Sequence, residues 1–340
     1  TNFGPFEQRF RKESAEYVGQ EVETCLVSNA TVGLEIAIRL LLQKDAIKKQ
    51  VIMPSFTFAA GLDVVVGQGF DPVLIDVDEN WQPSLSQATQ YLQESHGQVS
   101  GILLGNSFGV GNPQIEDWEK LAAEHGLPLV VDSAAGYGSQ YVDGSKLGAH
   151  GDCEVFSFHA TKPFAIGEGG AITSRNSAFI EDCRKATNFG FGADRKAAIL
   201  GTNAKLEEIN CAIGLRQLRT YDQRLTLRRQ SLQTYKQHLA KAGVLFQAND
   251  DMSTVPFVSV KFDSPAQRDA AQNLLLKSGV DVKCYYDPIH RHPIADDLAV
   301  KSLSLDATNE LTDTIIALPL HDSMSDEHIA YITDLIHDAH

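Results

Sequence analysis

Short apolar runs alternate with amphipathic stretches through the first two thirds of the chain. The apolar runs predict strands, and apolar positions at three- and four-residue spacing between them predict helices. Strands separated by helices indicate a parallel sheet covered on both faces, with ligands at the carboxyl ends of its strands. We therefore expect strands at 50–53, 72–75, 101–104, 128–131, 154–157 and 171–173, with helices at 32–42, 58–66, 85–94 and 115–125.

The pattern changes after Asn203. A helical stretch without proline runs from about residue 206 to 242 and ends before Gly243. The sequence thus predicts an α/β fold in two parts. Residues 1–225 form a large domain with a mainly parallel central sheet, and residues 226–340 form a smaller C-terminal α+β domain, linked by this helix. In the smaller domain we expect strands at 254–260 and 280–283 and helices at 265–277, 309–317 and 326–337.

The composition excludes several classes of protein. Of the 340 residues, 43% are hydrophobic and 21% are charged, which is typical of a globular protein with a large core. The apolar runs are too short to cross a bilayer, so we expect no membrane partner. A net charge of −15 argues against nucleic acid as a partner, because a phosphate backbone attracts a basic face.

The cysteines are scattered and never form a C-x-x-C pair. This spacing is typical of reduced thiols and not of a disulfide framework or a zinc site. No signal-peptide pattern is visible at the start of the chain, so we expect a cytoplasmic protein. The cysteines are Cys25, Cys153, Cys183, Cys211 and Cys284.

The strongest chemical signal is Lys162. It closely follows the strand predicted at 154–157, where partial desolvation would favour a neutral amine that can attack an aldehyde. Asp132 ends the strand predicted at 128–131, so its carboxylate can reach the same crevice and pair with a pyridinium nitrogen. Pyridoxal phosphate (PLP) requires an amine and a carboxylate placed in this way. The alternative is a lysine that only pairs with an acidic neighbour.

Other positions at strand ends fit the same cofactor. Segment 28–31 precedes a helix, so its backbone N–H groups and the Thr31 hydroxyl can hold a phosphate, or Asn29 or Thr31 can be a simple N-cap. Phe58, or Phe56 in its place, can stack on the cofactor ring or belong to the core. Ser157 can donate to the phosphate or be satisfied by neighbouring backbone.

Two later segments carry further candidates. Asn203 and Lys205 follow a glycine-rich stretch and can contact a phosphate from a partner subunit, or cap the next helix. Segment 285–293 gathers aromatic, imidazole and guanidinium groups. We expect no metal at His290 and His292, because no acidic or thiol ligand lies nearby at convincing spacing.

With these positions in hand, the chain resembles the DegT/DnrJ/EryC1/StrS family of sugar aminotransferases, within the fold-type I PLP enzymes. The similarity runs through nearly the whole chain, and the lysine segment is its most specific part. The segments that carry it are TNFGP (1–5), SNATVGL (28–34), PSFTF (54–58), VDSAAGYG (131–138), SFHATKPFAIGEGGAI (157–172), GTNAKLEEINCAIGLRQL (201–218) and ALPLH (317–321).

The resemblance implies a role for each matching residue. Lys162 would be the Schiff-base lysine, and Asp132 would pair with the pyridine nitrogen. The Ala30 backbone, Thr31 and Ser157 would hold the phosphate, with Asn203 or Lys205 reaching in from the second subunit of a homodimer. By position, we place five further residues beside the acceptor substrate: His159, Asn188, Tyr286, His290 and Arg291.

The implied reaction moves an amino group from an amino acid, expected to be glutamate, to a keto-deoxysugar linked to a nucleoside diphosphate. Pyridoxamine phosphate would be the intermediate form of the cofactor. Ala135 departs from the family, whose members usually carry Gln or His there, near the phenolic oxygen of the cofactor. That hydrogen bond must therefore come from elsewhere or be missing.

Other functions stay open on the same fold. They are a dehydratase, an aminotransferase for a cyclitol or another ketone, and a non-catalytic regulatory protein. Lys162 favours transamination, because some dehydratases of the family carry His at that position. A nicotinamide oxidoreductase is disfavoured, because the glycine-rich segment 105–111 lacks the G-x-G-x-x-G spacing.

Overall fold

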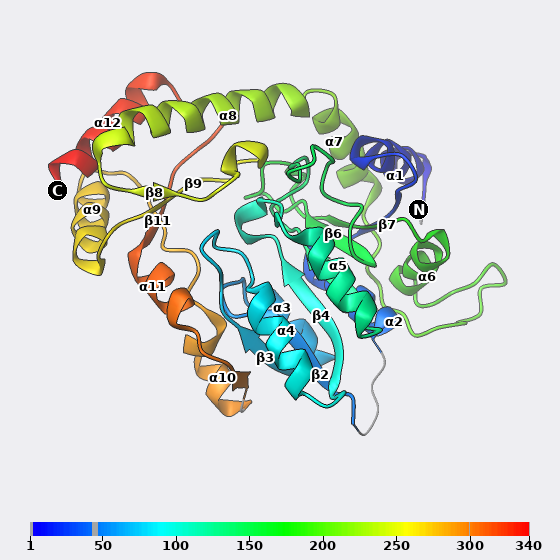
Figure 1. Ribbon diagram of the computed structural model, residues 1–340. Helices are drawn as coiled ribbons and strands as arrows, with labels where there is room; N and C mark the ends of the chain where they lie inside the picture. The colour runs from blue at the N-terminus through cyan, green and yellow to red at the C-terminus, as the bar shows by residue number, and fades with distance from the viewer. Residues whose placement is uncertain (1–2, 43–46, 299, 340) are drawn as a thin grey trace.

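The computed structural model describes residues 3–42, 47–298 and 300–339 (Figure 1). In these residues a sheet of eight strands has the order β1-β7-β6-β5-β4-β2-β3-β10. Strand β7 runs antiparallel to β1 and β6, and the remaining neighbours pair in parallel. The strands are β1 (Glu23–Val27), β2 (Gln50–Pro54), β3 (Asp71–Ile75), β4 (Val99–Gly105), β5 (Leu129–Asp132), β6 (Cys153–Ser157), β7 (Gly170–Ser174) and β10 (Lys301–Ser302).

Helices cover both faces of this sheet, as the alternation of side chains along each strand requires. Along β4, Ile102 and Leu104 join one apolar cluster, while Leu103 joins the other. The first cluster is completed by α1 (Pro5–Val18), α4 (Leu85–Glu94), α5 (Ile115–Glu124) and α7 (Glu208–Leu218). The second is completed by α2 (Ala30–Leu41), α3 (Ala60–Gly67) and α6 (Ser177–Thr187). The strands and helices predicted between residues 32 and 173 are therefore confirmed.

The predicted helix 206–242 is two helices. Helix α7 ends at Leu218, and α8 (Tyr221–His238) begins after Thr220, followed by the short 3-10 helix η2 (Leu239–Lys241). The two helices have different partners. Helix α7 packs on α1, where a Cβ at Gly214 would lie 2.5 Å from the Phe10 ring, whereas α8 packs on α12 (Asp326–Asp338). Tertiary packing therefore breaks a helix that the sequence pattern alone would continue.

A second sheet of three antiparallel strands has the order β11-β9-β8 in the described residues. Its strands are β8 (Leu245–Phe246), β9 (Val258–Lys261) and β11 (Ile315–Leu318), and α9 (Pro265–Lys277) packs beside them with α12 and the end of α8. The helix predicted at 309–317 is α11 (Asp306–Thr314), which stops because buried Ile315 and Ile316 enter β11. The strand predicted at 280–283 is absent from the described chain, where Lys283 forms a single bridge to Ala317.

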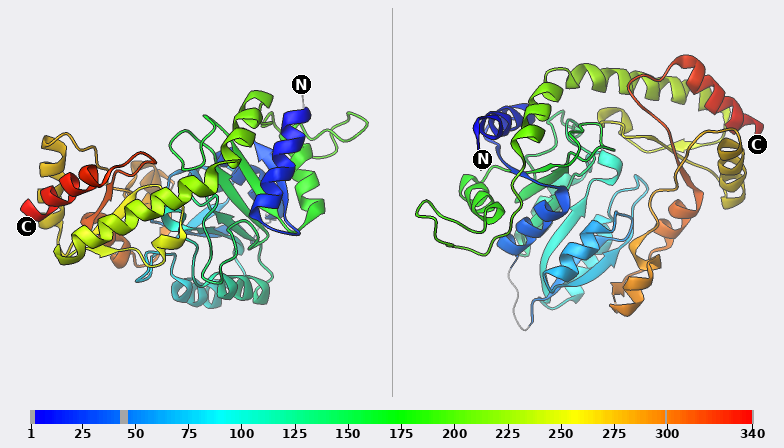
Figure 2. Two further views of the ribbon diagram at one scale, coloured as in Figure 1. Left: turned by 90° about the horizontal axis from the view of Figure 1, so that it is seen from above. Right: turned by 180° about the vertical axis from the view of Figure 1, so that it is seen from behind.

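Helix α8 joins the two parts of the molecule, and the two termini lie at opposite ends (Figures 1 and 2). Tyr221 and Leu225 of α8 belong to the cluster beneath the large sheet, whereas Leu232 and Tyr235 belong to the cluster of the small one. The chain later returns to the large sheet through α10 (Pro293–Asp297) and β10, which pairs with β3. The domain limits at 225 and 226 stay a prediction.

No helix in the described part of the chain is long and apolar enough to cross a membrane. Short 3-10 helices occur at η1 (Ser107–Gly109), η3 (Asp250–Met252) and η4 (Ile289–Arg291).

Arg228 on α8 holds the junction together. The residue is 6% exposed, and its guanidinium donates to Asp322 Oδ1 at 2.8 Å. It also donates to the carbonyl oxygens of Val255 and Pro256, at 2.9 and 3.1 Å, and to that of Leu320 at 3.2 Å. One buried side chain therefore satisfies several carbonyl groups that no secondary structure pairs.

We predict that Arg228→Met lowers the free energy of unfolding by about 3 kcal/mol, because it leaves buried carbonyl groups unpaired and removes one of the two arginines that pair with Asp322. Urea unfolding followed by circular dichroism measures this loss. Arg9→Met is the control, because Arg9 is exposed and pairs only with Glu13 one helical turn away, so a change of less than about 0.5 kcal/mol is expected. Equal losses in the two variants would contradict the role given to Arg228.

Candidate active site

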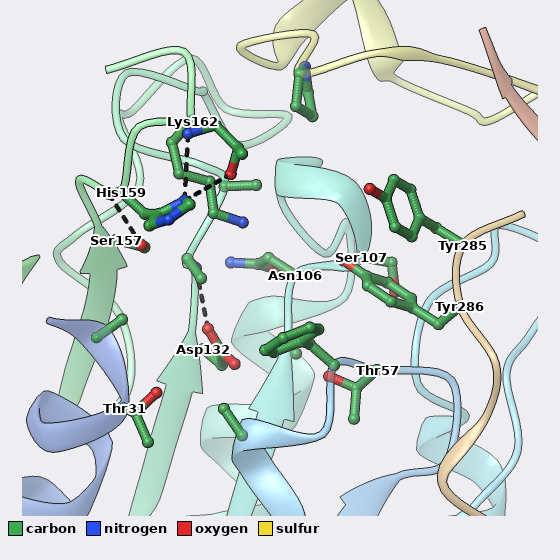
Figure 3. A pocket seen from close by; sticks show the side chains of 18 of the residues that line it. Thr31, Thr57, Asn106, Ser107, Asp132, Ser157, His159, Lys162, Tyr285 and Tyr286 are labelled. Carbon is green, nitrogen blue, oxygen red and sulfur yellow. Dashed lines mark hydrogen bonds between the residues drawn. The ribbon is translucent and has the colours of Figure 1, made fainter. Parts of the chain in front are cut away.

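A cavity of about 390 Å³ lies at the carboxyl ends of β4, β5 and β6. This is where a mainly parallel sheet places ligand sites. Figure 3 shows side chains from well-separated parts of the chain meeting there. Its wall includes the start of α2, the segments after β2 and β5, the loop after β6, Pro256 and Phe257, and the pair Tyr285 and Tyr286.

Asp132 and Lys162 both line this cavity, as predicted. Asp132 is the last residue of β5, and its Oδ1 accepts a hydrogen bond from the Ala134 N–H at 3.0 Å. Lys162 lies in the turn after β6, where its N–H donates to the His159 carbonyl at 2.9 Å. The Lys162 Nζ has no hydrogen bond or ion pair with any described residue.

Burial acts on these two groups in opposite directions. It lowers the pKa of the Lys162 amine, an effect that the charge of Asp132 opposes. It raises the pKa of the Asp132 carboxyl, which the Ala134 N–H and the charge of Lys162 oppose. Burial thus disfavours the charged form of each group, and a cationic ligand beside Asp132 would stabilise its carboxylate.

The start of α2 provides a seat for an anion. Asn29 caps the helix, because its Oδ1 accepts from the Val32 N–H at 2.9 Å. This leaves the N–H groups of Ala30 and Thr31 without a hydrogen-bond partner in the described chain, beside the Thr31 hydroxyl. Both interpretations of this segment therefore hold: Asn29 is the N-cap, and the free N–H groups can still bind a phosphate.

Gly170 allows β7 to approach this seat. A Cβ there would lie 3.0 Å from the Ala30 nitrogen and 2.6 Å from the Phe156 carbonyl oxygen. Ser157, on the neighbouring strand, also lines the cavity, and its Oγ accepts from the His159 N–H at 3.3 Å. Two unpaired N–H groups and two hydroxyls can bind a phosphate here. A carboxylate and an amine line the same cavity, so the residues present fit PLP.

The aromatic candidates occupy different environments. Phe56 is 1% exposed and packs edge-on against Phe108, with ring centroids 5.6 Å apart. Phe58 is 65% exposed, although it also lines the cavity. Phe58 is therefore the ring free to stack on a ligand, and that role stays a prediction.

Of the residues predicted beside the acceptor, His159 and Tyr286 line the cavity. The His159 Nδ1 lies 2.9 Å from the Thr161 Oγ1, and its Nε2 lies 3.4 Å from the Glu168 Oε1. Because Thr161 and Glu168 line the same cavity, this trio forms one side of its entrance.

His290 and Arg291 do not line the cavity, although they lie close to its wall in sequence. The His290 Nδ1 lies 2.7 Å from the Ser55 Oγ, and its Nε2 lies 3.0 Å from the Asn309 Oδ1. Arg291 donates to Asn309 and forms an ion pair with Asp313. These contacts fasten the segment that carries Tyr285 and Tyr286 to β2 and α11.

Asn188, Asn203 and Lys205 form a separate group outside the cavity. Asn188 and Asn203 form an antiparallel bridge, and the Lys205 Nζ donates to the Asn203 Oδ1 at 2.7 Å. The Lys205 ammonium also lies 4.9 Å from the centroid of the Phe189 ring. These residues do not line the cavity of their own chain, and contact of Asn203 and Lys205 with a cofactor in another subunit stays a prediction.

Several lining residues were not predicted from the sequence. Asn106 and Ser107 follow β4 in the glycine-rich segment that was considered only as a dinucleotide motif. Their position after a predicted strand was the signal that could have identified them. Pro256 and Phe257 carry no comparable signal, because only the fold of the second sheet brings them to the cavity.

The fold and the site are those of a PLP enzyme, and comparison with known proteins identifies the class. A model of the DegT/DnrJ/EryC1/StrS aminotransferase family matches residues 1–337, and the chain belongs to this family. It is thus a PLP-dependent aminotransferase.

Three similar proteins illustrate the match. Protein Rv3402c of Mycobacterium tuberculosis (strain ATCC 25618 / H37Rv) is 41% identical over 343 residues, covering 100% of this chain and 83% of that protein. The dTDP-4-amino-4,6-dideoxy-D-glucose transaminase of Shigella dysenteriae is 29% identical, over 99% of this chain and 90% of that protein. A crystal structure from Bacillus cereus ATCC 10987, assigned as a PLP-dependent aminotransferase, has a TM-score of 0.92 and 30% identity, and the match covers 99% of this chain and 92% of that one.

We predict that Lys162→Met raises the free energy of unfolding of the cofactor-free protein near neutral pH. The folded state no longer has to bury an amine whose charged form it disfavours. Because burial places the folded-state pKa below the ordinary value of 10.5, wild-type stability rises as the pH increases toward that value. The gain from Lys162→Met should therefore shrink on going from about pH 7 to about pH 10.

Urea unfolding at the two pH values measures this change, with Lys241→Met, at an exposed position, as the control. A gain independent of pH would show that added apolar surface, and not the desolvated amine, is responsible.

Proposed function

We propose that the protein moves an amino group from an amino acid, with glutamate the first candidate, to the carbonyl carbon of a deoxysugar carried on a nucleoside diphosphate. The observation that supports this most is the unpaired Lys162 amine, which faces the same cavity as Asp132 and the anion seat at α2. The Shigella dysenteriae relative is named for a dTDP-linked amino sugar, which suggests the class of acceptor.

Each residue of the site would have one task. PLP, when bound, supplies an aldehyde for the amino group and a ring that delocalises the negative charge left when a proton is removed from carbon. Asp132 would hold a proton on the ring nitrogen, and the seat of Ala30, Thr31 and Ser157 would fix the phosphate. In the first half of the reaction, Lys162 would take a proton from the α-carbon of the amino acid. In the second half, it would deliver a proton to the sugar carbon that receives the nitrogen.

The acceptor would lie against the wall opposite Lys162. Tyr285 and Tyr286 extend into the cavity there (Figure 3), and Phe257 packs against Tyr285. Their aromatic surface suits the apolar face of a deoxysugar ring. Lys162 and His159 are the basic residues among those that line the cavity. Because the net charge of the protein is −15, its overall electrostatic field does not attract a diphosphate. Further cationic groups near this site would have to come from outside the residues that line the cavity.

A homodimer would bring such groups. The Lys205 ammonium lies over the ring of Phe189, which is 48% exposed in the single chain. Leu200 and Ile209, nearby in sequence, are also unusually exposed, at 79% and 67%. Exposed apolar side chains in this segment favour a protein interface. We therefore propose that a second copy covers this surface and that Asn203 and Lys205 contact the phosphate in the partner's cavity.

The half-reactions test the chemistry. Glutamate added to the PLP-loaded protein should replace the visible absorption band with that of the pyridoxamine form, and a nucleotide-linked keto-sugar should restore it. Lys162→Ala should still bind PLP but lose turnover by about four orders of magnitude, because it removes the amine that would move the proton. Asp132→Ala should reduce turnover far more than Asn203→Ala.

A panel of thymidine, guanosine and uridine diphosphate keto-sugars, beside a cyclitol ketone, defines the acceptor. Turnover with the cyclitol ketone alone would contradict a nucleotide-linked substrate, and near-normal turnover of Lys162→Ala would contradict the role of the lysine.

Mixed dimers test the shared site. Lys162→Ala and the double variant Asn203→Ala/Lys205→Ala should each be impaired alone. When the two are mixed and allowed to exchange subunits, one cavity of each heterodimer regains all its groups, so activity should rise toward about a quarter of wild type. Light scattering gives the mass of each variant. A monomeric wild type, or no recovery in a mixture shown to contain heterodimers, would contradict the shared site.

A further inference from the structure

Ala135 leaves part of the cavity wall without a hydrogen-bonding side chain. Its methyl group lines the cavity, and its carbonyl accepts from the Thr254 Oγ1 at 2.6 Å. A Cβ at Gly109 would lie 2.6 Å from the same carbonyl oxygen, so this segment is closely packed from behind. A polar ligand atom beside Ala135 must therefore find its partner on another segment.

The neighbouring amide of Asn106 is already engaged. Its Nδ2 donates to the Ser133 Oγ at 2.8 Å and to the Tyr141 hydroxyl at 3.2 Å, and its Oδ1 accepts from the Asn112 N–H at 2.9 Å. Ser133 in turn donates to the buried Glu154. Because both amide protons of Asn106 have partners inside the protein, it is a structural group beneath the cavity.

Tyr286 offers a phenolic hydroxyl to this cavity. The hydroxyl has no hydrogen-bond partner among the described residues, and Figure 3 shows the rings of Tyr285 and Tyr286 extending into the cavity. The Tyr286 ring is held in place by stacking on Phe108, with centroids 5.2 Å apart, and by an edge contact with Phe56 at 5.5 Å. A ring fixed on two sides presents its hydroxyl at little entropic cost.

The electrostatic surroundings keep this hydroxyl protonated. Burial raises the pKa of Tyr286, and the nearby charge of Asp132 adds to the effect. The hydroxyl can therefore donate a hydrogen bond throughout the neutral pH range, and Tyr286 lines the same cavity as Asp132.

We propose that the Tyr286 hydroxyl donates a hydrogen bond to the phenolic oxygen of bound PLP, in place of the side chain that Ala135 lacks. This inference rests on the cofactor site proposed above. It makes Tyr286 a cofactor-tuning residue, whereas its neighbour Tyr285, whose ring packs on Phe257, contacts the acceptor alone.

A pH titration of the visible absorption of the PLP-loaded protein, without substrate, tests the proposal. A donor to the anionic phenolic oxygen stabilises the deprotonated form of the lysine-linked chromophore. Tyr286→Phe should therefore raise the apparent pKa of the absorbance change by about one pH unit, the effect of one hydrogen bond to a charged group. Tyr285→Phe is the matched control and should leave that value unchanged.

A second variant tests whether the hydrogen bond can be restored from another position. Adding Ala135→Gln to Tyr286→Phe places an amide donor at the position that lacks one, so the apparent pKa should return toward the wild-type value. An unchanged apparent pKa in Tyr286→Phe, whether or not the KM for the acceptor rises, would overturn the proposal. If the Lys162→Ala variant instead shows the same visible band as the wild-type protein, PLP is not attached at Lys162, and the cofactor site proposed above is overturned.

Discussion

The site depends on the partial burial of two groups of opposite charge at the ends of adjacent parallel strands. Asp132 ends β5, Lys162 follows β6, and the two are not in ion-pair contact. Burial penalises the charged form of each, and their mutual attraction offsets only part of that penalty. Burial therefore lowers the pKa of the Lys162 amine and raises that of the Asp132 carboxyl, and a cationic, aldehyde-bearing ligand between them would relieve both penalties.

The rest of the molecule fixes this arrangement. Apolar clusters on both faces keep the central strands in register, and helix α2 points its unpaired N–H groups at the same cavity. The second sheet contributes Pro256 and Phe257, and Arg228 holds their backbone against α8 through the carbonyl groups of Val255 and Pro256. Stability of the junction and shape of the active site are therefore coupled through one buried guanidinium.

Polar side chains in and around the cavity have different tasks. Asn106 lines the cavity but donates to Ser133 and Tyr141 inside the protein, whereas the Tyr286 hydroxyl has no hydrogen-bond partner among the described residues. His290 and Arg291, expected beside the substrate, contact Ser55, Asn309 and Asp313 and position the tyrosine segment from outside. A residue near a cavity in sequence can thus shape it without touching the ligand.

The sequence by itself determined the alternating strands and helices of the large sheet, and the places of Asp132, Lys162, Ala30, Thr31 and Ser157. Those features depend on local periodicity and on the rule that parallel strands bring their carboxyl ends to one edge. Only the tertiary structure decided that the helix breaks after Leu218, that residues 315–318 form a strand, and that Pro256 and Phe257 meet the cavity. These outcomes depend on contacts between residues far apart in the chain, which overrule local preference and leave no periodic signal.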